Sequence, residues 1–153
     1  MTDHSFRRAA AADAARVEAI THRAYEKWVP IIGRPPKPMT ADYAAAVLDH
    51  VIDLLIDGCG DVAGLVELIP QQDHWLIENV AVDPAHQGKG YGRILVGHAE
   101  ELTRQAGLKT IRLYTNKLFA ANVALYLKLG YALDREEEFR GGIIVHMSKA
   151  LTP

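Results

Sequence analysis

The sequence predicts a mixed α/β (α+β) fold, and two patterns carry this prediction. Residues from about 52 to 82 form a series of extended segments with turns at 58–61 and 70–73, which is typical of an antiparallel meander. The chain then runs through a glycine-rich loop into a helical pattern, and a strand-like segment follows at 109–115. This order predicts a parallel pair of strands joined by a right-handed crossover.

The N-terminal third predicts mainly helices. Residues 5–9 can form a short edge strand, and Asp13 is the expected N-cap of a helix that runs to about Trp28. The segment 29–39 holds four prolines and predicts a loop of extended character. Thr40 is then expected to cap a second helix that reaches about residue 51.

The C-terminal third predicts a helix and two closing strands. The helix is expected at 117–129 with Gly130 as its stop, and the strands at 131–139 and 143–150. We expect residues 1–153 to form a single domain, which suits a chain of this length. Exposed strands at the end of the chain favour a homodimer.

Composition excludes several classes of protein. The formal net charge is -2, which gives no electrostatic basis for binding nucleic acid or an acidic membrane. Cys59 is the single cysteine, so we expect a reducing, cytoplasmic setting without an internal disulfide. No histidine spacing predicts a metal site, and no apolar run is long enough to span a membrane or act as a signal peptide.

The segment 80–93 is the most informative stretch of the sequence. An apolar strand stops at Asp83 and Pro84, and a glycine-rich loop carrying Lys89 then enters a helix at about Gly90. Glycines at alternate positions let the backbone approach a ligand closely, and the start of a helix carries a partial positive charge. The segment therefore predicts a cradle for an anion such as phosphate.

Two common phosphate-binding patterns do not fit this loop. A dinucleotide fingerprint requires glycine where Arg93 stands, and a Walker loop requires serine or threonine where Gly90 stands. The pattern Gln-x-x-Gly-x-Gly does fit, and it resembles the cofactor-binding motif of the GNAT superfamily, the acyl-CoA-dependent N-acyltransferases. The resemblance continues through 113–116, 122–131 and 145–151.

The resemblance implies a fold and an acyl donor. It implies a central mixed, mostly antiparallel, twisted sheet of about seven strands, flanked by four helices and splayed between the fourth and fifth strands. Acetyl-CoA would be the acyl donor, with its pantetheine arm pairing like a short strand with the fourth strand. The residues implied in donor binding are Val80, Ala81, Val82, Gln87, Gly88, Lys89, Gly90, Tyr91, Gly92 and Asn122.

Direct acyl transfer requires an acid for the departing thiolate, and Tyr126 is the candidate. A phenol is matched to a thiolate leaving group, and the family places a tyrosine at this helix position beside the thioester sulfur. The alternative is a core tyrosine whose ring packs on the sheet. Asn122 lies one helical turn before Tyr126, so both can face the cofactor arm.

Transfer also requires a base for the attacking amine, and here the sequence leaves a choice. Glu78 lies on the third strand from about residue 52, four residues before Val82, and the two-residue period places both on one side. Glu67 on the neighbouring strand is the rival, and a chain of waters could serve instead. Either carboxylate could also bind the ammonium group of the acceptor.

The acceptor is left open by the sequence. The resemblance implies a GNAT-type N-acetyltransferase acting on a primary amine of a small molecule or peptide in a ternary complex. The alternatives are a non-catalytic acyl-CoA-binding regulatory module and an acetyltransferase directed at a protein, a peptide or aminoacyl-tRNA. Tyr25, Trp28 and Arg34 around the proline-rich segment 29–39 favour either a lid with an acceptor pocket or a plain covering layer.

Overall fold

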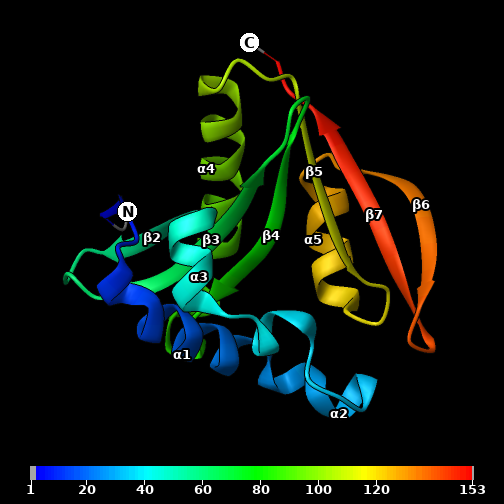
Figure 1. Cartoon of the computed structure of the whole chain (residues 1–153), viewed down its shortest axis with the longest axis horizontal. Coiled ribbons are helices and arrows are strands. Elements are labelled where there is room, and N and C mark those ends of the chain that lie inside the picture. Colours follow the sequence, from blue (N-terminus) through cyan, green and yellow to red (C-terminus); the bar gives the residue numbers. More distant parts are fainter. Residues whose placement is uncertain (1–2, 153) are drawn as a thin grey trace.

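A seven-stranded mixed sheet forms the centre of the computed structural model, which describes residues 3–152 (Figure 1). The strand order is β1-β2-β3-β4-β5-β7-β6, and every neighbouring pair is antiparallel except β4–β5. The strands are β1 (His4–Arg8), β2 (Val51–Asp57), β3 (Val62–Pro70), β4 (Trp75–Val82), β5 (Thr110–Asn116), β6 (Ala132–Phe139) and β7 (Gly142–Ala150). The predicted fold class is confirmed.

The parallel pair β4–β5 stays together over only three residue pairs. The last pair joins Ile77 to Leu113, and beyond it the two strands diverge toward their carboxyl ends (Figure 1). Residues 78–82 of β4 and 114–116 of β5 are therefore not paired with each other. This is the splay expected between the fourth and fifth strands.

Helices cover both faces of the sheet. On one face, α4 (Tyr91–Gln105) and α5 (Ala120–Lys128) enclose a core that includes Leu95, Leu113 and Tyr126. On the other face, α1 (Ala14–Tyr25) and α3 (Tyr43–Asp49) enclose a second core, with β-sheet residues such as Leu54 and Leu65 fully buried. Within residues 3–152, no helix is both long and apolar enough to cross a membrane.

The proline-rich segment differs from the prediction. It is not extended, because it contains the short helix α2 (Val29–Ile32) and a 3-10 turn at Lys37–Thr40, after another 3-10 turn at Glu26–Trp28. The reason is that proline fits the first positions of a helical turn, where its missing N–H would have no partner. Pro30 and Pro38 thus lie in the first turns of these short helical segments, whereas Pro36 has an extended backbone with ψ of 154°.

Both predicted helix caps are also corrected. Helix α3 is capped by Asp42, whose carboxylate accepts a hydrogen bond from the Ala45 amide, and Thr40 belongs to the preceding turn. Asp13 occupies the N-cap position of α1 as predicted, but its carboxylate does not cap the helix, because it is bound to the Arg7 guanidinium at 2.9 Å and to the Ala10 amide at 2.8 Å. A short-range sequence pattern cannot reveal such a competing partner.

Gly64 allows β3 and β4 to approach each other next to the splay. A β-carbon on Gly64 would lie 2.6 Å from the Ala81 carbonyl oxygen and 3.2 Å from a methyl group of Leu95. Both neighbours belong to the packed centre of the sheet, so neither can move without disturbing β4 or α4. The position therefore requires glycine for reasons of space.

We predict that Gly64→Ala destabilises the protein by about 1–3 kcal/mol, the usual cost of adding a methyl group to a filled core. The matched control is Gly97→Ala in α4, where a β-carbon would meet nothing within 4 Å. That variant should gain about 0.5–1 kcal/mol from helix propensity. Thermal or urea unfolding of both variants measures the difference, and equal stabilities would contradict the packing argument.

Candidate active site

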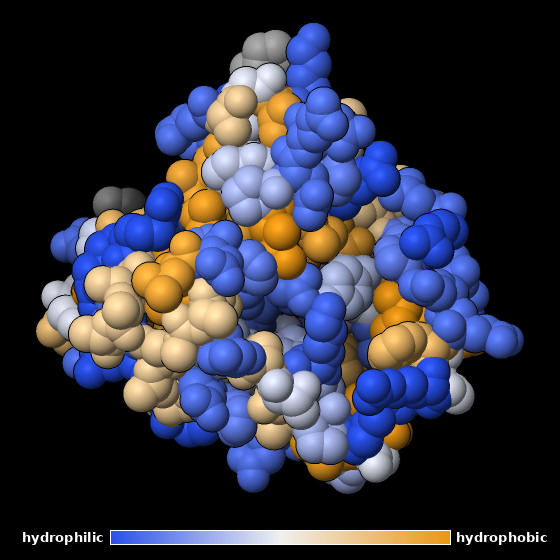
Figure 2. All heavy atoms as spheres, in the orientation of Figure 1, coloured by the Kyte–Doolittle hydropathy of each residue, from blue (hydrophilic) through white to orange (hydrophobic). Residues whose placement is uncertain are grey.

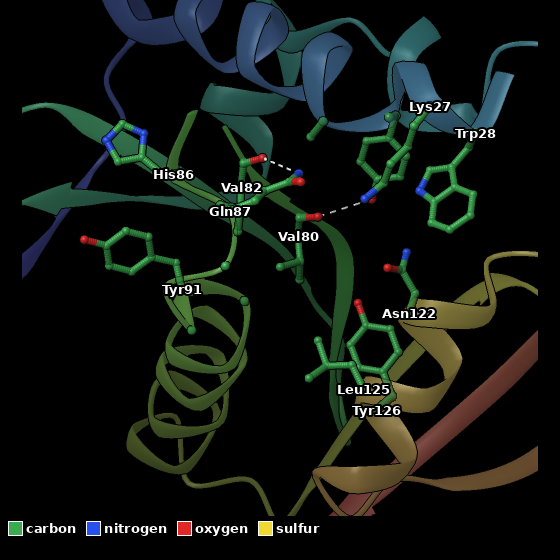
Figure 3. A pocket seen from close by; sticks show the side chains of 15 residues that line it. Lys27, Trp28, Val80, Val82, His86, Gln87, Tyr91, Asn122, Leu125 and Tyr126 are labelled. Atoms are coloured by element: carbon green, nitrogen blue, oxygen red, sulfur yellow. Dashed lines mark hydrogen bonds between the residues drawn. The ribbon is translucent and has the colours of Figure 1, made fainter. Parts of the chain in front are cut away.

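A groove of about 200 Å³, called here the donor groove, lies where β4, the loop after it, α4, α5 and α1 meet (Figure 3). Strand β4, the loop after it and helix α5 contribute to it, although α5 is far from β4 in the sequence. Its lining residues are Ala24, Tyr25, Lys27, Trp28, Val80, Val82, His86, Gln87, Gly88, Gly90, Tyr91, Gly92, Asn122, Leu125 and Tyr126.

The glycine-rich loop has the conformation of an anion cradle. Gly88 and Gly90 both have left-handed backbone angles, with φ of 81° and 80°, and the space where a β-carbon would stand is empty at each. Helix α4 begins directly after Gly90, so the N–H groups of its first turn have no partner within the helix. The loop fits a phosphate group, because these donors gather at the positive end of the helix.

The free edge of β4 presents two carbonyl groups to the donor groove. The Val80 carbonyl accepts a hydrogen bond from the Tyr25 hydroxyl, and the Val82 carbonyl accepts one from the Gln87 side-chain amide, each at 3.4 Å. These bonds are long, and within residues 3–152 no strand pairs with this edge beyond Ile77. The edge therefore fits the amide-bearing pantetheine arm, which can pair with it as an added strand.

Helix α5 supplies the opposite wall of the groove. Asn122 and Tyr126 lie one turn apart and both extend from α5 toward the groove (Figure 3). The Tyr126 ring packs in the core against Tyr131, with ring centres 5.9 Å apart, and only 8% of the residue is exposed. Burial raises the pKa of Tyr126 to about 12, so its hydroxyl keeps its proton at neutral pH.

A larger cavity of about 580 Å³, called here the central cavity, adjoins the donor groove at Tyr25, which lines both. It lies between the proline-rich segment and β5, and the strand residues Glu78 and Tyr114 line it. Figure 2 shows this face of the molecule hollowed where Figure 1 places the diverging ends of β4 and β5. Hydrophilic residues surround much of the hollow.

Three polar side chains meet on the wall of the central cavity. The Tyr114 hydroxyl donates to Glu78 Oε1 at 2.6 Å, while Lys37 Nζ lies 3.0 Å from the Tyr114 oxygen and 3.2 Å from Glu78 Oε1. Burial raises the pKa of Tyr114 to about 12, so this phenol is a donor and not a base. Glu78 is the group of the three that can take up a proton from an incoming amine.

Glu78 does not lie beside Val80 and Val82 as the sequence period predicted. Glu67 pairs with Asn79, yet the next residue of β3 pairs with Ile77, so Glu78 is an extra residue in β4. Such a β-bulge breaks the two-residue alternation. Glu78 consequently lines the central cavity and not the donor groove.

The rival base Glu67 lies in a third cavity of about 250 Å³ between α3, β3 and β4, called here the acidic pocket. Its side chain is only 3% exposed, and His50 Nδ1 lies 2.6 Å from its Oε2. Burial raises the pKa of Glu67 above its usual range, and the neighbouring His50 opposes that shift. Glu78 also lines this pocket, whereas Glu67 does not reach the central cavity.

Most of the predicted donor-binding residues line the donor groove, with two exceptions. The Ala81 side chain is buried in the core under α1 and α3, and Lys89 is exposed on the loop outside the groove lining. The sequence reasoning missed Lys37, Tyr114 and His50. In the sequence, each of these three is a polar residue near the end of a strand or in a loop. Such residues are too common for this position to mark them as functional.

With this geometry in view, the chain can be placed in a family. The family described as Acetyltransferase (GNAT) family matches residues 16–131, which include most of α1, the glycine-rich loop and α5. The chain therefore belongs to the GNAT acetyltransferases. The match includes strands β3, β4 and β5, whereas β6 and β7, which also line the central cavity, lie beyond it.

Curated relatives match a part of the chain. A streptothricin acetyltransferase from Streptomyces lavendulae is 33% identical over 75 residues, which is 48% of this chain and 40% of that protein. A ribosomal protein bS18-alanine N-acetyltransferase from Escherichia coli K12 is 37% identical over 59 residues, or 39% of this chain and 40% of the relative. The matched segment thus spans less than half the length of either relative.

Solved structures share the whole fold. The ribosomal-protein-S18-alanine N-acetyltransferase from Escherichia coli superposes with a TM-score of 0.80 at 21% identity, covering 99% of this chain and 96% of that one. A PaiA N-acetyltransferase from Thermoplasma acidophilum in complex with coenzyme A gives 0.76 at 15% identity, covering 97% and 99%. At these identities, the likeness establishes the fold alone.

We predict that Gly90→Ala weakens acetyl-CoA binding about tenfold, because a left-handed alanine is strained by roughly 1–2 kcal/mol and relaxation would turn the loop N–H groups away. Gly33→Ala is the matched control: Gly33 has φ of 76° and open space around it, but it ends α2 outside the donor groove. Titration calorimetry with acetyl-CoA measures both affinities. Equal affinities would contradict the assignment of the cradle.

Proposed function

We propose that this protein transfers the acetyl group of acetyl-CoA to a primary amine of a small molecule or peptide, by direct attack in a ternary complex. One observation carries the proposal: the donor groove and the central cavity meet at Tyr25, where β4 and β5 diverge. A donor along β4 and an amine in the central cavity could therefore meet, with Tyr126 in one chamber and Glu78 in the other.

The donor groove fits acetyl-CoA through backbone groups more than through charge. The loop from Gln87 to Gly92 would hold the pyrophosphate, and the carbonyls of Val80 and Val82 would pair with the pantetheine arm. Asn122 would add an amide donor from α5. Bound in this way, acetyl-CoA supplies an activated thioester carbonyl.

Two residues would then move the protons. Glu78, directly or through a water, takes a proton from the acceptor ammonium, so that the free amine can attack the thioester carbonyl. A carbon–nitrogen bond forms, the carbon–sulfur bond breaks, and Tyr126 gives its proton to the departing thiolate. The attacking nitrogen then releases its second proton, which returns directly or through water to the Tyr126 oxygen and leaves a neutral amide. The contact between Glu78 and the central cavity favours this carboxylate over Glu67 as the base.

We predict that Tyr126→Phe lowers kcat by about 10²–10⁴-fold, the usual contribution of a positioned general acid. The affinity for acetyl-CoA should change little, since the ring stays in the core. Steady-state kinetics and calorimetry separate the two effects. Because burial raises the pKa of Tyr126 to about 12, the wild-type rate should not fall with loss of this proton below about pH 11. An unchanged kcat in the variant would remove Tyr126 as the acid.

The proposed function itself is tested by a thiol-release screen with acetyl-CoA as donor over amines, amino acids and N-terminal peptides. We expect release of free CoA with at least one class of amine. A regulatory module that only binds acyl-CoA would show affinity by calorimetry and no acceptor-dependent thiol release. Absence of acetyl-CoA binding up to millimolar concentration would contradict both the acetyltransferase and the regulatory module.

The screen includes peptides because one matched relative is named for an alanine of a ribosomal protein, whereas another is named for streptothricin. The central cavity has a volume of about 580 Å³, which lies in the usual range for a small-molecule site. Aminoacyl-tRNA is the least favoured acceptor, since the net charge of -2 provides no general attraction for phosphate backbones.

A further inference from the structure

The acidic pocket has a lining that is rich in hydrogen-bond acceptors. Four carboxylates line it, from Asp42, Asp49, Glu67 and Glu78, against one lysine, Lys37, and one histidine, His50. The carboxylate of Asp42 is used to cap α3, and those of the two glutamates lie at the buried end of the pocket. Acidic side chains alone do not define a binding site. Evidence for a ligand has to come from the other polar groups in the pocket.

Asn79 provides an independent observation at the base of this pocket. It is 2% exposed, and its side-chain oxygen is buried without a hydrogen-bond partner among the described residues. Its amide nitrogen donates to Thr21 Oγ1 at 3.1 Å and to the Tyr43 hydroxyl at 3.3 Å. An unpaired carbonyl oxygen at this depth is costly, because burial removes the water that would otherwise bind it.

The hydrogen-bond network fixes which end of the Asn79 amide is unpaired. The Tyr43 hydroxyl has one proton, which it donates to the Pro38 carbonyl at 2.6 Å. Tyr43 must therefore accept from Asn79, and the group facing it must be the amide NH₂. The oxygen of Asn79 is consequently left as an acceptor without a donor.

Glu67 places a second acceptor beside this oxygen. Glu67 and Asn79 are directly paired across β3 and β4, so their side chains extend from the same face of the sheet. His50 binds Oε2 of Glu67, and no described residue donates to Oε1. Two acceptors with unused capacity thus lie together at the buried end of the pocket.

An ammonium group already lies at the junction of this pocket with the central cavity. Lys37 Nζ is 3.2 Å from Glu78 Oε1, and both residues line the two cavities. The lysine side chain is 66% exposed and reaches this position from the proline-rich segment. The contact shows that the geometry of this wall accepts a primary ammonium.

From these contacts we infer that the acidic pocket binds a second ammonium group of the acceptor, through Glu67 and Asn79, so that the preferred substrate is a diamine or a larger polycationic amine. The inference rests on the proposed function for the first amine, which would react in the central cavity. A protonated amine is the matching ligand, because it brings N–H donors and positive charge and no acceptor. A carboxylate or phosphate would bring further acceptors and negative charge to Glu67 and Asn79, which already have unused acceptor oxygens.

The test compares α,ω-diaminoalkanes of increasing length with n-alkylamines of the same length, in the thiol-release assay with saturating acetyl-CoA. The wild type should favour diamines in kcat/KM by about tenfold to hundredfold, the range expected for hydrogen bonds to a charged group. The optimum chain length would report the separation of the two sites. Equal values for both series would overturn the inference.

Glu67→Gln is the diagnostic variant, since it keeps the shape of the side chain and removes its charge. We expect it to lower the diamine-to-monoamine ratio of kcat/KM about tenfold or more. Glu101→Gln is the matched control, on the exposed surface of α4 outside the acidic pocket, and should keep the wild-type ratio. An unchanged ratio in Glu67→Gln would overturn the inference.

Two further measurements keep the test decisive if a variant or the assay fails. Asp49→Asn changes an exposed residue of the pocket rim and should lower the ratio about twofold to fivefold even if Glu67→Gln does not fold. Calorimetric titration of a diamine into the protein without donor tests binding alone. If the wild type binds a diamine and Glu67→Gln does not, the inference is supported even without turnover. In that case the proposed function fails separately. If the wild type neither binds a diamine nor prefers it as a substrate, the inference is overturned.

Discussion

The pairing between β4 and β5 ends after Ile77 and Leu113, and the site depends on that interruption. The same point of β4 carries the bulge, because Glu78 has no partner in β3 either. Glu78 is therefore unpaired with both neighbouring strands, β3 and β5. The side chain of Glu78 therefore does not follow the alternating pattern of β4, and its carboxylate accepts a hydrogen bond from the hydroxyl of Tyr114 on β5. The backbone beyond it presents the carbonyls of Val80 and Val82 to the donor groove instead of to a neighbouring strand.

The second constraint is the cost of keeping two carboxylates away from water on one side of this sheet. Glu78 and Glu67 each have one polar partner within 3.0 Å, Tyr114 for the first and His50 for the second. A buried charge without a partner would shift its protonation or destabilise the fold. The raised pKa of Glu67 shows that its partner offsets burial only in part. A cationic acceptor would compensate the remainder, which links the fold energetics of this face to what it binds.

The sequence predicted the donor side of the site far better than the acceptor side. Gln87, Gly90 and Gly92 line the donor groove at a strand–helix junction, and the backbone conformation of such a junction can be predicted from a short stretch of residues. Tyr126 was predicted from the resemblance to the family, and helical periodicity then placed Asn122 one turn before it; both line the donor groove. By contrast, the proline-rich segment was predicted to be extended because proline is unfavourable inside a helix. Proline is favourable in the first turn of a helix, however, and Pro30 and Pro38 lie in such turns.

The acceptor side was beyond sequence reasoning for a physical reason. The contacts of Glu78 join residues 37, 78 and 114, and a single bulge in β4 decides which cavity the carboxylate enters. Periodicity cannot anticipate a bulge, because it assumes the very alternation that a bulge breaks. The unpaired oxygen of Asn79 is a still finer property, since it depends on where the one proton of Tyr43 is donated. The acceptor specificity that we propose would therefore depend on an incomplete hydrogen-bond network, which only the folded arrangement of α1, α3 and β4 defines.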